Sequence, residues 1–241
     1  FIFILISQFA FAQTTYVPDD NFEQALIDLG YDDTLDDYVL TANISGVTYL
    51  DVDDEGISDL TGIEAFTALT GLLCNSNQLT TLDVSANTAL TSLDCGSNSI
   101  TSLNVSGLTA LITFFCHNNQ LTSLDVSSNT ALYSLWCPEN QLTSLDVSAN
   151  TALTELRCSA NSITTLDVSA NADLSILTCD ANQLTSLDVS ANTALTRLDC
   201  YNNQLTTLNL SANTALTRLD CNSNQLTSLD VSANTSLTNL Y

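Results

Sequence analysis

The stretch LTRLDCYNNQLTTLNLSANTA, residues 195–215, is built from two similar halves. LTRLDCYNNQ and LTTLNLSANTA both read L-T-x-L-[D/N]-apolar-x-x-N, so the unit is a doublet. The doublet recurs every 21 residues to the end of the chain, with a leucine at its first position each time. These leucines are Leu69, Leu90, Leu111, Leu132, Leu153, Leu174, Leu195, Leu216 and Leu237. A fixed period of this length is typical of a solenoid, in which each coil buries its apolar side chains against its neighbours.

The composition agrees with one elongated apolar core and sets limits on the partners. Of the 241 residues, 45% are hydrophobic and 12% are charged. The chain contains 27 acidic residues, three arginines and no lysine, which gives a net charge of −24. Such a surface repels the phosphates of nucleic acid and anionic lipid, so neither is expected as a partner. No apolar run reaches the ~18 residues that a transmembrane helix needs, so no transmembrane segment is predicted.

The N-terminal stretch FIFILISQFAFAQ has the character of a secretory signal. Its apolar run ends in Ala10-Phe11-Ala12, the small-x-small pattern that precedes signal-peptidase cleavage. An initiator methionine and a basic segment are missing, so we interpret residues 1–12 as an incomplete signal peptide, with a buried strand as the alternative. The chain is therefore expected to be secreted or to lie at the cell surface, outside the cell.

Residues 13–46 do not follow the repeat and are predicted to form an N-terminal cap. Within them, DDNFEQALIDLG (residues 19–30) opens with helix-starting residues, carries apolar side chains on one face and ends in a glycine. A short helix here would cover the apolar end of the first coil. The solenoid itself is predicted over residues 47–241, beginning with a 22-residue unit at residues 47–68.

The pattern L-x-x-L-x-C-x-x-N-x-L-x-x-L-D-V-x-x-N-x-x is similar to bacterial leucine-rich repeats of the short, nested 21-residue type. The unit at residues 47–68 resembles the repeats of internalins, and the resemblance covers residues 47–241. It implies a β-rich leucine-rich-repeat solenoid with parallel strands stacked in register, on a secreted or surface protein used for binding. It does not imply which ligand is bound. The register stops at Tyr241, position five of a ninth repeat, so we expect the encoded protein to continue with a cysteine.

Cysteine occupies the sixth position of every full repeat, where other leucine-rich repeats carry leucine. The eight residues are Cys74, Cys95, Cys116, Cys137, Cys158, Cys179, Cys200 and Cys221. Stacked coils would place successive Cα atoms about 4.8 Å apart, a separation that a disulfide tolerates. Equivalent residues of adjacent parallel strands point the same way, however, so we expect free, packed thiols, with disulfides as the alternative. A single file of cysteines offers no tetrahedral metal cluster, and no cofactor is predicted.

Two columns of asparagine are predicted to satisfy the backbone where each coil bends. The first comprises Asn77, Asn98, Asn119, Asn140, Asn161, Asn182, Asn203 and Asn224. The second comprises Asn87, Asn129, Asn150, Asn171, Asn192, Asn213 and Asn234, with Leu108 as the exception. A structural role is expected for both columns.

Acidic residues occur in two arrangements that raise the question of cation binding. DVDDEG (residues 51–56) matches the start of a calcium-binding loop, but Gly62 stands where the bidentate glutamate is needed, so we interpret it as repeat sequence. The other is a column interrupted by Asn104 and Asn209. It contains Asp83, Asp125, Asp146, Asp167, Asp188 and Asp230. We interpret this column as a solvated face, with loose cation binding as the alternative.

The sequence offers no pattern typical of an enzyme. It contains one histidine and lacks the nucleophile-elbow, zinc-protease, phosphate-loop and C-x-x-C motifs. We therefore do not expect catalysis.

The positions that vary between repeats indicate where a ligand binds. Position five reads Leu73, Asp94, Phe115, Trp136, Arg157, Thr178, Asp199, Asp220 and Tyr241. These side chains alternate with buried ones, so they face outward from the strands. Phe115, Trp136 and Arg157 would be consecutive neighbours flanked by Tyr133 and His117, and a cation-π contact between Trp136 and Arg157 is expected. The five residues are predicted to form a platform for an extracellular protein, peptide or glycan.

The two remaining arginines, Arg197 and Arg218, lie at position three of later repeats. Aspartates stand two residues further on, at Asp199 and Asp220. We interpret these residues as local charge pairs.

Two alternative functions remain open at this point. One is an acidic structural or adhesive array whose aspartate column binds divalent cations. The other is ice binding, suggested by the row Thr80, Thr101, Thr122, Thr143, Thr164, Thr185, Thr206 and Thr227. Neighbouring charged aspartates suit a flat lattice match poorly.

Overall fold

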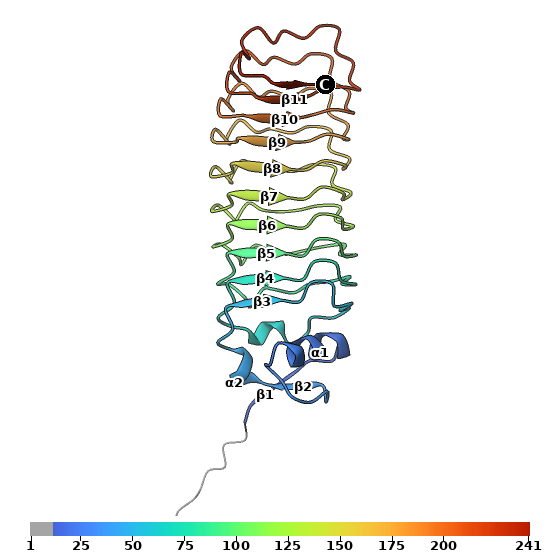
Figure 1. Cartoon of the computed structure of the whole chain (residues 1–241), viewed down its shortest axis with the longest axis vertical. Helices are drawn as coiled ribbons and strands as arrows, with labels where there is room; N and C mark the ends of the chain where they lie inside the picture. The colour runs from blue at the N-terminus through green and yellow to red at the C-terminus, as the bar shows by residue number, and fades with distance from the viewer. Residues whose placement is uncertain (1–11) are drawn as a thin grey trace, which may run out of the picture.

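The computed structural model describes residues 12–241, and these form a solenoid whose coils stack along one axis above an N-terminal cap (Figure 1). Residues 1–11, which hold nearly all of the proposed signal peptide, lie outside the described residues. Within residues 12–241, none of the helices has the length and apolar character needed to span a bilayer.

A parallel ten-stranded sheet runs along one side of the solenoid in chain order. Its strands are β3 (Tyr49–Asp51), β4 (Gly71–Leu73), β5 (Ser92–Asp94), β6 (Thr113–Phe115), β7 (Ser134–Trp136), β8 (Glu155–Arg157), β9 (Ile176–Thr178), β10 (Arg197–Asp199), β11 (Arg218–Asp220) and β12 (Asn239–Leu240). From β4 onward each strand begins at position three of a repeat, and neighbours pair without a register shift. The central leucine or phenylalanine of β3 to β11 is buried, while its two neighbours face outward. The predicted solenoid of in-register parallel strands is confirmed.

The cap consists of a short hairpin and helices at the end of the sheet. Strand β1 (Thr14–Tyr16) pairs antiparallel with β2 (Tyr38–Leu40), and α1 (Asp20–Asp28) lies between them in sequence. The helix falls within the predicted stretch, and the carboxylate of Asp19 caps it by accepting hydrogen bonds from two backbone amides. A four-residue helix α2 (Thr41–Ile44) leads into β3, and a 3₁₀ turn η1 (Ile63–Ala65) follows it.

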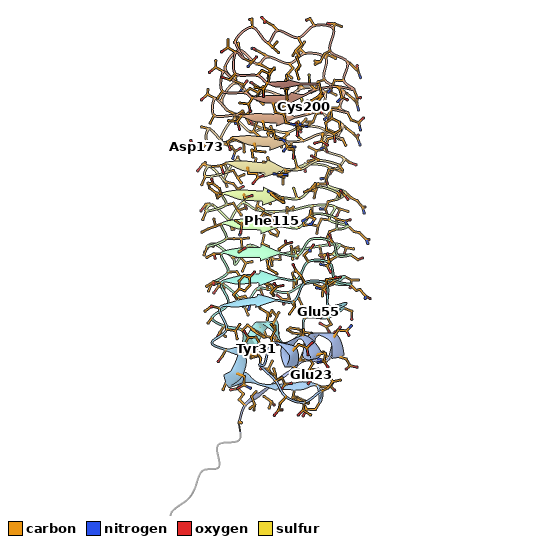
Figure 2. The ribbon with its side chains drawn as sticks, viewed as in Figure 1. Glu23, Tyr31, Glu55, Phe115, Asp173 and Cys200 are labelled. Carbon is orange, nitrogen blue, oxygen red and sulfur yellow. The ribbon has the colours of Figure 1, made fainter. Side chains whose placement is uncertain are left out.

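A buried glutamate holds the cap together, a role that the sequence pattern did not reveal. Glu23 of α1 is fully buried, and its Oε1 accepts hydrogen bonds from the backbone amides of Asp36 and Tyr38, both at 3.0 Å. Glu23 and Tyr31 lie together at the cap end in Figure 2. Burial, followed by the charges of neighbouring carboxylates, raises the pKa of Asp32 in the same loop. The loop is therefore fastened to α1 by one carboxylate.

The eight cysteines are free and buried, as predicted. Burial raises the pKa of every thiol, that of Cys137 to about 12. In three coils the sulfur lies within hydrogen-bonding range of the next strand, as where Cys74 Sγ donates to the carbonyl of Asp94 at 3.4 Å. The column thus replaces a buried aliphatic residue by a small apolar one.

The first asparagine column joins successive coils, as predicted. Asn182 is typical: its Nδ2 donates to the carbonyls of Cys158, Cys179 and Asp180 at 3.0, 3.1 and 3.2 Å. Its Oδ1 accepts from the backbone amide of Ile163 at 3.0 Å. One side chain therefore satisfies four backbone groups on two coils.

The second column uses the donor half of each amide. Nδ2 of Asn171 donates to the carbonyls of Val147 and Asn150 at 3.1 and 2.9 Å. Its Oδ1 is buried and has no hydrogen-bond partner among residues 12–241, and the same holds for the other six members of the column. The two ladders therefore differ in the number of backbone groups that depend on them.

The thiols give the first testable expectation. The native protein should resist a thiol reagent at about pH 8, because burial keeps the thiols protonated and covered. All eight should react after denaturation without reductant, and Cys158→Val should cost under about 1.5 kcal/mol of unfolding free energy. Mass spectrometry of the labelled protein counts the thiols, and two or fewer reactive groups in the denatured protein would indicate disulfides.

The two asparagine ladders should differ in their contribution to stability. Asn182→Ala leaves the buried backbone amide of Ile163 without a partner and removes one of two hydrogen bonds from each of three carbonyls, which we expect to cost about 2–3 kcal/mol. Asn171→Ala removes one of two hydrogen bonds from each of two carbonyls, leaves no backbone amide unpaired and removes an unpartnered oxygen, so a loss of about 1–2 kcal/mol is expected. Urea unfolding followed by circular dichroism compares them. An equal or larger loss for Asn171→Ala contradicts the assignment.

Candidate functional site

Three of the predicted site residues form one stack on the outward face of the sheet. Phe115, Trp136 and Arg157 end β6, β7 and β8 and occupy paired positions in register. The rings of Phe115 and Trp136 stack with centroids 4.5 Å apart at an interplanar angle of 30°. The Cζ of Arg157 lies 4.2 Å from the centroid of the Trp136 ring, which is the expected cation-π contact. We call these three residues the aromatic stack, and Figure 2 shows Phe115 midway along the sheet.

The order of the strands decides which surfaces of the stack are free. Because β7 lies between β6 and β8, Phe115 and Arg157 cover opposite faces of the Trp136 indole. The indole therefore presents its edge to solvent. Its Nε1 is buried and has no hydrogen-bond partner within residues 12–241. A ligand at the stack therefore meets the edge of the Trp136 indole and not one of its faces.

Arg157 is held in position by its own strand. Its Nε and Nη2 contact Oε1 of Glu155 at 2.7 and 2.6 Å. The other carboxylate oxygen, Oε2, accepts a hydrogen bond from the hydroxyl of Ser134 on β7 at 3.2 Å. The guanidinium is thus fixed between an ion pair and an indole face before any ligand arrives.

The other two predicted residues lie beside the stack. Tyr133 is exposed at the start of the β7 coil and precedes the strand. His117 is half-buried and its ring lies on Gly96 of the preceding coil, where a methyl group would clash with it. The Nδ1 of His117 has no partner in the part of the chain that the structure describes. The five predicted residues therefore lie near one another. Three of them form the stack, and Tyr133 and His117 flank it.

A polar pocket of about 260 Å³ opens next to the stack, on the side of Arg157. Sequence reasoning did not predict it, although it is lined by all three arginines of the chain. The lining comprises Pro138, Arg157, Ser159, Thr178, Asp180, Arg197, Asp199, Tyr201 and Arg218. We call it the arginine pocket. A sign in the sequence was that the three arginines of the chain lie on the outward face within four successive coils.

The charge pairs predicted for the later arginines are present, with one change of partner. Arg197 Nε contacts Oδ2 of Asp199 at 2.7 Å, and Arg218 Nε contacts Oδ1 of the same carboxylate at 3.0 Å. Arg218 therefore pairs with the preceding coil, and Asp220 instead accepts a hydrogen bond from Asn222 at 2.6 Å. The prediction of pairing within one coil was wrong for Arg218, because the in-register stack brings Asp199 within its reach.

The second carboxylate of the pocket also has a hydrogen-bond partner. Asp180 is buried and accepts a hydrogen bond from the hydroxyl of Ser159 at 2.6 Å. A hydrogen bond to Asp180, followed by its charge, raises the pKa of Tyr201. The pocket therefore combines occupied acceptors with cationic donors, and this arrangement suits binding.

The aspartate column serves the turns of the coils. Oδ1 of Asp146 accepts a hydrogen bond from the backbone amide of Ser148 at 2.9 Å. Each of the five remaining aspartates of the column likewise accepts a hydrogen bond from the amide of the serine two residues later. The two asparagines that interrupt the column form the same hydrogen bond. Asn104 and Asn209 accept from the backbone amide of the serine two residues later, at 3.1 and 3.0 Å. The column is therefore selected for an acceptor that closes the turn.

The acidic segment at residues 51–56 also takes part in the stacking. Asp53 Oδ1 accepts from the backbone amide of Asn75 on the next coil at 2.6 Å. Within residues 12–241, no group of three or more histidine, cysteine or acidic side chains is arranged to hold a metal ion. The segment is part of the first coil.

The hydrogen bonds of the aspartate column predict a dependence of stability on pH. The serine hydroxyl, followed by the serine amide, lowers the pKa of Asp146 and Asp167. A lowered folded-state pKa gives stability that is present above the unfolded value of about 3.9 and is lost as the pH falls through the folded value. Thermal melts should therefore show a fall below about pH 4 that is smaller in an Asp146→Asn, Asp167→Asn double variant.

The same column gives an expectation for salt. Sodium chloride should raise the melting temperature about as well as calcium at equal ionic strength, because only screening is involved. A calcium effect that Asp146→Asn abolishes would instead indicate coordination.

Comparisons with known proteins agree with this architecture. No protein-family model matches the chain. Internalin J of Listeria monocytogenes is 46% identical over 70 residues, which is 29% of this chain and 8% of that protein. The solved functional domain of internalin J, described as including a cysteine ladder, aligns with a TM-score of 0.78 and 43% identity over 95% of this chain. This chain covers 56% of that domain, so it spans little more than half of it.

More distant structures share the fold. Internalin C2 of Listeria monocytogenes aligns with a TM-score of 0.70 and 22% identity, over 95% of this chain and 96% of that one. The plant peptide hormone receptor RGFR1, solved in complex with RGF2, aligns with a TM-score of 0.63 and 22% identity, over 74% of this chain and 36% of the receptor. This chain is a leucine-rich-repeat solenoid of 21-residue repeats similar to those of internalin J.

Proposed function

We propose that this chain is a secreted or cell-surface recognition module, not an enzyme, that binds a protein or peptide through the outward face of its strands. The observation that carries the proposal is the aromatic stack and the arginine pocket side by side on that face. Aromatic and arginine side chains supply much of the binding energy at protein interfaces. Positions one, four, six, nine and eleven of the repeat hardly change, because the stacked core and the first asparagine ladder require them.

The geometry supports a preformed site. Phe115 and Arg157 hold the Trp136 ring from both sides, and Glu155 holds the guanidinium. A ligand that binds here orders few side chains, so little conformational entropy is lost on binding. The indole edge and the unpartnered Nε1–H of Trp136 offer a hydrogen-bond donor to a ligand that displaces the atoms covering it.

Related solenoids support a protein or peptide ligand. The fold is shared with RGFR1, a peptide hormone receptor that is solved with RGF2 bound. The stronger likeness, to internalin J, supports a bacterial protein that acts outside the cell, and so does the signal-like stretch at residues 1–12.

The three alternatives have weaker support. A sugar ring stacks on an open aromatic face, and both faces of Trp136 are covered. A cation-binding array needs charge, yet Asn104 and Asn209 replace aspartate in the column with the same hydrogen bond. An ice-binding row needs a flat uncharged surface, and the threonine row is followed three residues later by the acidic column.

The test is a peptide and glycan array probed with the wild-type protein and with variants. Trp136→Ala and Arg157→Ala should each weaken a specific peptide hit by about tenfold or more, because each removes one layer of the stack. Thr80→Ala, an exposed change on the threonine row, is the matched control and should bind normally. Melting temperatures check that each variant is folded.

Two array results would contradict the proposal. Specific hits that survive both Trp136→Ala and Arg157→Ala would place the binding site elsewhere on the solenoid. Hits confined to glycans would favour the carbohydrate alternative over the protein or peptide ligand.

A further inference from the structure

The arginine pocket concentrates the positive charge of a strongly acidic chain. The net charge is −24, and the three positively charged side chains, Arg157, Arg197 and Arg218, all line this one pocket. They come from β8, β10 and β11, so they converge across four coils. Two carboxylates, Asp180 and Asp199, complete the charged lining. Elsewhere on the surface a carboxylate-bearing ligand meets acidic or neutral side chains.

The acceptors and the donors of this pocket are used to different extents. Asp199 is engaged by two guanidinium groups, and Asp180 by the hydroxyl of Ser159. The carboxylates therefore have partners already.

The arginines have N–H donors that no other described residue uses. A guanidinium carries five N–H donors, and the ion pairs of the three arginines use Nε and Nη2 or Nε alone. Nη1 of each arginine makes no hydrogen bond to another residue within 12–241. A pocket with occupied acceptors and spare cationic donors is complementary to an anionic group that accepts several hydrogen bonds.

We propose that the arginine pocket binds the side-chain carboxylate of an acidic residue in a peptide ligand whose neighbouring segment lies along the aromatic stack. This assignment rests on the proposed function. Arg157 belongs to both parts, since one face of its guanidinium lies on Trp136 while the group lines the pocket. A planar guanidinium recognises a carboxylate through two parallel hydrogen bonds, so the contact is directional as well as charged.

The spacing of the coils gives the spacing in the peptide. The pocket is centred two to three coils from Trp136, and coils stack about 4.8 Å apart, so the distance is about 10–14 Å. An extended peptide advances about 3.3 Å per residue, so the acidic residue lies about three or four positions from the apolar or aromatic residue at the stack. The net negative charge opposes the approach of an acidic peptide, but it is screened beyond about 8 Å at physiological salt.

The experiment selects peptides from a random library on the wild-type protein and remeasures them one residue at a time. Selected peptides are synthesised with each Glu changed to Gln or Asp to Asn, and affinity is measured by fluorescence anisotropy. We expect one acidic residue, three or four positions from an apolar or aromatic one, whose change weakens binding to the wild type by about tenfold.

The variant Arg218→Gln tests whether the pocket is responsible. Arg197 still pairs with Asp199 after this change, so the buried carboxylate is not left alone and the fold should be retained. In Arg218→Gln, the acidic and amide forms of the peptide should differ by less than about threefold, because one of the three guanidinium groups of the pocket is lost. Thr88→Glu, an exposed change outside the pocket, alters the net charge by the same amount and should bind like the wild type.

Each contrary result has a distinct meaning. Peptides that need Trp136 but no acidic residue overturn this assignment and leave the proposed function standing. Equal losses in Arg218→Gln and Thr88→Glu overturn it as well, because overall charge then explains the effect. A protein that selects no peptide, or only peptides that tolerate Trp136→Ala, overturns the proposed function and this assignment together.

Discussion

In-register stacking of parallel strands is the constraint on which the rest of this structure depends. Each coil must place the same kind of side chain at the same position as its neighbours, since the strands pair without a shift from β3 to β12. An inward position repeated in this way becomes a buried column of leucine or cysteine. A backbone group that one coil cannot satisfy is met by an asparagine of the next, as Ile163 is by Asn182.

The same register builds the candidate site on the opposite face of the strands. Outward side chains on adjacent coils are separated by about the strand spacing of 4.8 Å, which is close to the distance at which flat groups stack. Phe115, Trp136 and Arg157 therefore lie face to face, at 4.5 and 4.2 Å, without any special arrangement of the backbone. A solenoid can make a rigid recognition surface from a few substitutions at one variable position, while the core stays constant.

The period of the sequence predicted the fold, the strands, the buried cysteines and the position of the stack, because these depend on one repeat and its nearest copies. What it missed depends on partners that a single repeat does not contain. Arg218 pairs with Asp199 of the preceding coil, and Glu23 fastens a loop that follows it by more than ten residues. Whether an outward ring shows a face or an edge also depends on both neighbours, and the structure adds that both faces of the Trp136 ring are covered.

The acidity of this chain has separate causes, and distinguishing them bears on ligand choice. In the aspartate column, Asn104 and Asn209 accept the same turn-closing hydrogen bond as the aspartates do. The turn therefore needs the acceptor oxygen and does not need the negative charge. In the pocket, Asp199 forms ion pairs with two guanidinium groups, and there its charge is needed. The face that carries the column therefore repels anions as a by-product of turn formation, whereas the pocket offers an anion cationic donors. Long-range repulsion combined with one local attraction favours a ligand with a single acidic group over a highly acidic one, and this selectivity needs no further contacts.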